Sequence, residues 1–115
     1  MKALTFVLFP LLLFLSCEDN TAMLRIQNTS TFNYENLVVR DWNIGSLPAG
    51  ETTDYKAFDG IYSYGYISLF INGKNFVLQP IDFVGEKQYT KGQFKYNINV
   101  SDTSGTSVEL FFVEE

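Results

Sequence analysis

Residues 62–78 read YSYGYISLFINGKNFVL, and two apolar runs in this stretch flank the pair Asn72-Gly73. Asn-Gly suits a type I′ turn, because both central residues of that turn need a positive φ, which glycine adopts freely and asparagine tolerates. A two-residue turn also sets the register of the hairpin, here with Ile71 opposite Lys74. The sequence therefore predicts an antiparallel β-hairpin centred on this pair.

Alternation along the hairpin sorts its side chains between two faces. One face gathers large apolar residues, which we expect to be buried at about 1.5–3 kcal/mol each; they are Ile67, Leu69, Phe76 and Leu78. The other face carries an aromatic set, Tyr62, Tyr64, Tyr66 and Phe70. Aligned rings can stack on sugars or contact a protein partner, so this set is the candidate binding face. The alternative is structural packing, because tyrosine favours strands in any case.

Similar β-branched and aromatic runs follow one another from Thr21 onward, separated by turn residues, with no sustained helical period. Seven strands are expected: Met23–Gln27, Leu37–Trp42, Thr52–Phe58, Tyr62–Ile71, Asn75–Leu78, Gln93–Val100 and Ser107–Val113. This pattern predicts an all-β fold, a single antiparallel β-sandwich of immunoglobulin-like or transthyretin-like type. Trp42, the sole tryptophan, is expected in its core.

Composition excludes several classes of function. The hydrophobic fraction of 46% predicts a folded chain, and the 115 residues are enough for one domain. Net charge is -5 and the eight basic residues are scattered, so a nucleic-acid partner is not expected. The chain has no histidine and one cysteine, which removes the commonest catalytic base and any internal disulfide. We therefore expect a protein that is not an enzyme and holds no metal or cofactor.

The N-terminus has the layout of a secretory signal, with Lys2 followed by the apolar run Leu4–Leu15. This run is shorter than the ~17–25 residues of a transmembrane helix. It ends at Ser16-Cys17, and this junction resembles the bacterial lipobox. The resemblance implies that Cys17 becomes the lipidated N-terminal residue of the mature protein. The acidic pair Glu18 and Asp19 resembles the export signal of Bacteroidetes-type lipoproteins.

These resemblances imply a protein that is anchored by lipid to the outer membrane and displayed at the cell surface. Anchoring at the periplasmic face of the outer membrane is the alternative. The expected organisation is a signal peptide over 1–16, a lipidated cysteine with a short acidic tether over 17–22, and a β-sandwich over 23–115. Together with the turn Leu47–Glu51, the cysteine junction resembles short lipoproteins of such bacteria that carry one immunoglobulin-like domain.

Three functions remain open for such a protein. The first is a non-enzymatic interaction or structural module of the cell envelope, which needs an open hydrophobic edge or patch. The second is a glycan-binding surface protein, which needs Tyr62, Tyr64 and Tyr66 exposed as a flat platform. The third is an inhibitor of a hydrolase, which needs a protruding loop such as Asp82–Lys91.

Overall fold

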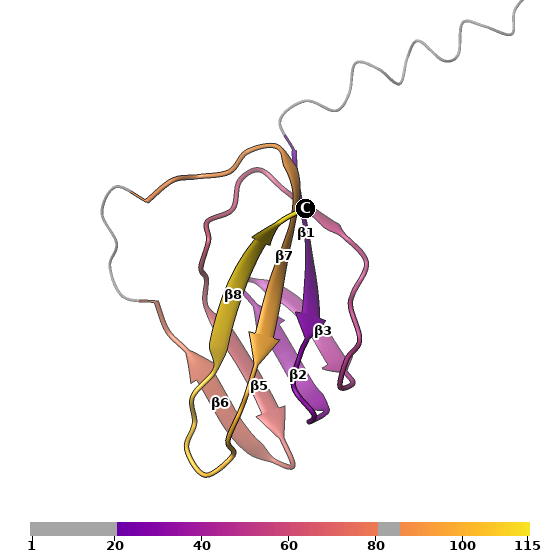
Figure 1. Ribbon diagram of the computed structural model, residues 1–115, viewed down its shortest axis with the longest axis vertical. Helices are drawn as coiled ribbons and strands as arrows, with labels where there is room; N and C mark the ends of the chain where they lie inside the picture. Colours follow the sequence, from indigo (N-terminus) through magenta and orange to yellow (C-terminus); the bar gives the residue numbers. More distant parts are fainter. Residues whose placement is uncertain (1–20, 81–85) are drawn as a thin grey trace, which may run out of the picture.

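Two four-stranded sheets face each other in a computed structural model that describes residues 21–80 and 86–115 (Figure 1). The strands are β1 (Ala22–Asn28), β2 (Tyr34–Val39), β3 (Trp42–Leu47), β4 (Lys56–Phe58), β5 (Ile67–Ile71), β6 (Lys74–Leu78), β7 (Gly92–Asn99) and β8 (Glu109–Glu114). The first sheet has the order β4-β1-β7-β8 and the second the order β3-β2-β5-β6. The all-β sandwich expected from the sequence is therefore confirmed, with eight strands in place of seven.

The β5–β6 hairpin has the register that the sequence predicts, from Ile71 opposite Lys74 to Ile67 opposite Leu78. Its turn residues Asn72 and Gly73 have φ angles of 50° and 83°, as a type I′ turn requires. Ile67, Leu69 and Phe76 are fully buried, and Leu78 packs partly buried against the same core.

The first half of the expected strand Tyr62–Ile71 is not a strand, because β5 begins only at Ile67. The carbonyls of Tyr62 and Tyr64 accept the hydroxyl of Tyr96, and only Tyr66 O, which accepts the amide of Arg40 at 2.8 Å, continues the pairing of β2 with β5. Gly65 is buried against the Arg40 side chain, where a Cβ atom would come within 3.1 Å of Arg40 Cγ. Residues 62–66 therefore cross the end of the sandwich before the chain enters β5.

The expected strand Leu37–Trp42 is likewise two strands, because the chain reverses at Arg40-Asp41 and continues as β3. Arg40 has a φ of 61°, the sign that a two-residue turn of type II′ needs at its first position. Arginine is not a typical turn residue, so the sequence carries no local signal for this hairpin. Trp42 opens β3 and packs half-buried against the core.

The sheets are not purely antiparallel as expected, because β1 pairs in parallel with β7 along seven residues, Ala22 opposite Gly92 to Asn28 opposite Ile98. No short turn joins these two strands, so nothing in the local sequence sets their relative direction. Alternation of buried and exposed residues is the same for either direction, and it is regular in β1.

The ends of the sandwich differ in which strand termini they hold (Figure 1). At the end that we call the entry pole, β1, β3, β5 and β7 begin and β2, β4, β6 and β8 end. The opposite end, the far pole, holds the connections at residues 29–33, 72–73 and 100–108. It also holds residues 48–51, where the connection from β3 to β4 starts before it runs back beside β1. The first described residues of the chain therefore lie at the entry pole.

Asn28 closes the far end of β1 as a buried polar residue with every hydrogen-bonding group used. Its Nδ2 donates to the carbonyls of Phe32 at 2.7 Å and Leu47 at 2.9 Å. Its Oδ1 accepts from the amide of Ser30 at 2.9 Å and from the hydroxyl of Ser30 at 2.7 Å. This side chain therefore ties the connection 29–33 to the second sheet.

Replacing Asn28 by alanine should lower the free energy of unfolding by about 2–4 kcal/mol, because buried partners then lose their hydrogen bonds. Urea denaturation measures the change. The matched control is Asn99→Ala, which removes only an exposed hydrogen bond from Nδ2 to Glu109 at 2.8 Å and should cost less than about 1 kcal/mol. Equal costs for the two variants would contradict the structural role of Asn28.

Candidate functional site

The lipid-anchor residues expected from the sequence, Cys17 with the acidic pair Glu18 and Asp19, lie outside the described residues. Their roles stay predictions. Within the described residues, no helix is long and apolar enough to span a membrane.

The tyrosines of the candidate binding face lie in the connection between β4 and β5, at the entry pole, and all three are half-buried. The rings of Tyr62 and Tyr64 are neighbours, with centroids 5.9 Å apart and planes inclined at 32°. Phe70 lies four residues beyond Tyr66 on β5, ~13 Å along the strand, where it pairs with Glu35 and Asn75. The structure brings Tyr62 and Tyr64 together and separates Phe70 from them.

Tyr96 of the core fixes the backbone of residues 62–66, which we call the tyrosine segment. Its ring is fully buried, and its hydroxyl reaches the carbonyls of Tyr62 at 2.7 Å and Tyr64 at 3.0 Å. Burial raises the pKa of Tyr96 to about 12, and the positive charge of Arg40 opposes part of that rise. The segment is therefore positioned by a neutral phenol that donates to its backbone.

A second aromatic group lies at the same pole and joins the edge strands of the two sheets. Trp42 of β3 and Phe58 of β4 have ring centroids 6.1 Å apart. Lys56 Nζ lies 5.9 Å from the Trp42 ring centre, and the Arg40 guanidinium lies 5.1 Å from that of Phe58. Sequence reasoning missed this group, because its members come from separate strands and the β2–β3 turn was not foreseen.

The segment 86–91 covers another part of the entry pole. Tyr89 forms a two-way backbone bridge with Ile61, at 2.9 and 2.8 Å, and Lys87 Nζ lies 4.6 Å from the Tyr89 ring centre. The loop Asp82–Lys91, expected to protrude, lies partly outside the described residues, and its described half is tied to the domain. We call the rings of this pole the aromatic collar: Trp42, Phe58, Tyr62, Tyr64, Tyr66 and Tyr89.

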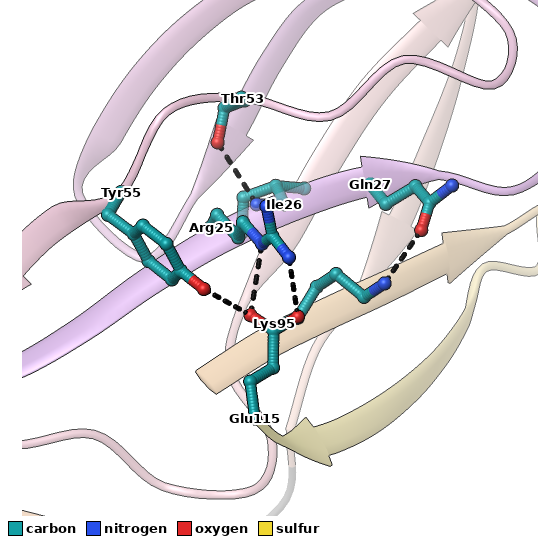
Figure 2. Close-up of polar contacts among 7 residues, drawn as sticks. All are labelled: Arg25, Ile26, Gln27, Thr53, Tyr55, Lys95 and Glu115. Atoms are coloured by element: carbon teal, nitrogen blue, oxygen red, sulfur yellow. Dashed lines mark hydrogen bonds and ion pairs between the residues drawn. The ribbon is translucent and has the colours of Figure 1, made fainter. Parts of the chain in front are cut away.

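The outer face of the first sheet carries a fixed polar cluster (Figure 2). Arg25 donates two hydrogen bonds to Glu115, from Nε at 3.0 Å and from Nη2 at 2.6 Å, and the Tyr55 hydroxyl donates to the same carboxylate at 2.7 Å. The bonds from Arg25 are the main reason why the pKa of Glu115 is below its ordinary value. Lys95 donates to Gln27 beside this cluster at 2.9 Å. These charges are satisfied within the domain.

Edge strand β8 exposes the largest apolar side chain on this face, because 56% of Phe111 is accessible to solvent. Phe111 pairs with Asn97 of β7, and the buried Oδ1 of Asn97 has no hydrogen-bond partner. Among the described strands, β8 has a neighbour on one side only, so backbone groups on its other side are open to a further strand. This edge is a candidate contact surface.

The described part of the chain offers several contact surfaces. Among the described residues there is no group of three or more side chains that could hold a metal ion. Asp102 has a lowered pKa, chiefly because it accepts the backbone amide of Ser104 at 2.9 Å. Aromatic rings, an open strand edge and paired charges are features through which proteins commonly bind partners.

Comparison with protein-family models, with curated proteins and with solved structures finds no match. The class that the structure defines is the two-layer β-sandwich. The finer immunoglobulin-like or transthyretin-like arrangement stays a prediction, and function has to be argued from the residues of this chain.

Replacing Tyr96 by phenylalanine should lower the free energy of unfolding by about 1–3 kcal/mol, because two carbonyls lose their buried donor. Amide hydrogen exchange should also become faster at residues 62–66. The matched control is Tyr34→Phe, which removes a hydroxyl bonded to Ile98 O at 2.9 Å, a carbonyl that also accepts the Thr29 amide. Exchange at residues 62–66 that is equally fast in both variants would contradict the positioning role of Tyr96.

Alkaline stability gives a second test of the same residue. The folded-state pKa of about 12 lies above the ordinary value of 10.0, so the stability that neutral Tyr96 confers is present below pH 10 and is lost as the pH rises to about 12. The loss is on the order of 2–3 kcal/mol. Denaturation at several pH values should show a smaller loss in Tyr96→Phe, and parallel profiles for the two proteins would refute the assignment.

Proposed function

We propose that this chain is a lipid-anchored protein of a bacterial envelope that acts by binding a protein partner along strand β8, and not by catalysis. The anchor is Cys17, and the supporting sequence feature is the apolar run that ends in Ser16-Cys17 before an acidic pair. The lipidated chain is held at the outer membrane, with the domain at the cell surface.

The observation that carries the binding role is the exposed Phe111 on an open edge strand. Pairing of a partner strand with β8 would satisfy its free backbone groups, and the exposed ring would supply apolar contact area beside them. Val113, half-buried on the same face, continues the apolar surface along the strand. Large exposed aromatic side chains are the usual anchors of protein interfaces.

Glycan binding at the tyrosines is the second candidate. Its supporting observation is the Tyr62–Tyr64 ring pair, held in place by Tyr96. The two rings are half-buried and inclined at 32°, so they do not form one flat platform. Stacking on a sugar would then use one ring at a time, which favours the β8 edge as the first surface to test.

The anchor is tested by mass spectrometry of the intact protein purified from its native membrane. We expect the mass of the mature chain to begin at Cys17 and to include acyl chains, and Cys17→Ser to leave the membrane fraction. An unmodified Cys17 in membrane-derived protein would overturn the anchor.

The contact surface is tested by identifying what co-purifies with the lipidated protein. Phe111→Ser should lose a stoichiometric protein partner, whereas Val77→Ser should keep it. Val77 is the matched control because it is 38% exposed on β6, an edge strand of the other sheet. A partner retained by Phe111→Ser would rule out this edge, and the absence of any partner in all samples would rule out the binding role.

A further inference from the structure

Tyrosine and tryptophan are distributed unevenly between the two poles. The chain has seven tyrosines and one tryptophan, and two of these residues, Tyr34 and Tyr96, are buried in the core. The other six are half-buried, and five of them belong to strand ends and connections of the entry pole: Trp42, Tyr62, Tyr64, Tyr66 and Tyr89. The sixth, Tyr55, directly precedes β4 and donates to Glu115 on the outer face of the first sheet. Rings with one apolar and one polar end are typical of the interface between a bilayer and water.

The far pole has a different surface. Its described segments, 29–33, 48–51, 72–73 and 100–108, contain neither tyrosine nor tryptophan and consist mainly of Ser, Thr, Asn, Asp and Gly. The stretch 104–107 is exposed throughout. The asymmetry therefore separates an aromatic pole from a polar, well-hydrated one.

Cations lie close to the rings of the aromatic collar. Lys56 and Lys87 are exposed, and each has its Nζ within 6 Å of a ring centre, at 5.9 Å for Trp42 and 4.6 Å for Tyr89. Lysine beside an interfacial ring can reach lipid phosphates while its stem stays on the apolar surface. Exposed acids, such as Asp41 and Asp59, lie in the same region, so ring insertion and not net charge would supply the contact.

The length of the tether brings this pole to the membrane. Five residue steps separate Cys17 from Ala22, which is a reach of at most about 18 Å. Ala22 pairs with Phe58, and the Phe58 ring lies 6.1 Å from that of Trp42. A lipid chain on Cys17 would therefore keep Ala22, and with it the entry pole, within this reach of the membrane surface.

We propose that the aromatic collar rests on the phospholipid headgroup layer, so that the sandwich stands upright on its entry pole. This inference rests on the proposed lipid anchor at Cys17 and adds a second, non-covalent contact to it. The contact fixes the orientation of the domain, and it occupies Tyr62 and Tyr64, which would then not be free to stack on a soluble glycan.

Trp42 is the only tryptophan, so its fluorescence reports on the collar without labelling. The experiment places the full lipidated protein in phosphatidylcholine vesicles whose acyl chains carry bromine just below the headgroups. Trp42 should lose most of its emission compared with vesicles that lack bromine. The matched control moves the reporter to the far pole with Trp42→Phe and Phe32→Trp, and its emission should be unchanged by bromine.

Each result decides between named alternatives. Lipidated protein with unquenched Trp42 would overturn the collar contact while leaving the anchor intact. Quenching at both poles would overturn the upright orientation. In the lipidated Tyr62→Ser, Tyr64→Ser variant, Trp42 should be quenched less than in the unsubstituted protein. Unchanged quenching would show that the tether alone holds Trp42 near the bilayer, which would overturn the collar contact. Mass spectrometry of the same sample separates these outcomes from failure of the proposed function, because a missing acyl mass at Cys17 would overturn the anchor itself.

Discussion

The parallel pairing of β1 with β7 is the constraint on which the rest of the structure depends. It joins the first described strand to one that begins 64 residues after β1 ends, and it aligns seven residue pairs. Strand β7 of this pair also carries residues that hold the connections at both poles in place. Tyr96 of β7 holds the tyrosine segment at the entry pole, and Ile98 O accepts the hydroxyl of Tyr34 and the amide of Thr29 at the far pole. Because β1 starts at Ala22, the same pairing decides which pole the tether reaches.

Local chemistry made part of this fold predictable. Asn72-Gly73 specified a turn and a register, since few other residue pairs accept two positive φ angles, and the structure has that register. Alternation also placed Ile67, Leu69 and Phe76 in the core. The β2–β3 turn was not predictable in this way, because Arg40 adopts a positive φ that its residue type does not favour. Such a turn is held by its tertiary setting, here the bond from the Arg40 amide to Tyr66 O.

The candidate site was predictable in composition but not in geometry. The tyrosines stood out in the sequence, and alternation assigned them to one face of a strand. They lie instead in a connection, because the core contributes a hydroxyl from Tyr96, 30 residues beyond Tyr66, that bonds to two of their carbonyls. Trp42 and Phe58 meet only because β3 begins and β4 ends at the same pole, each as an edge strand of its sheet. Long-range register of this kind has no signature in a local pattern.

The two proposed contacts are compatible because they use different parts of the sandwich. Strand β8 runs from the far pole to the entry pole, so its open edge stands roughly perpendicular to a membrane on which the entry pole rests (Figure 1). Phe111 lies midway along β8, three residues before Glu114 at the entry pole and two after Glu109 at its far end. At ~3.3 Å per residue, the ring is ~10 Å from the collar end of its strand, beyond the reach of the headgroups that the collar would contact. A fixed upright orientation would thus present the β8 edge sideways, where a neighbouring envelope protein in the same membrane can pair with it. It would also restrict that partner to approaches within the plane, which lowers the entropy lost on association.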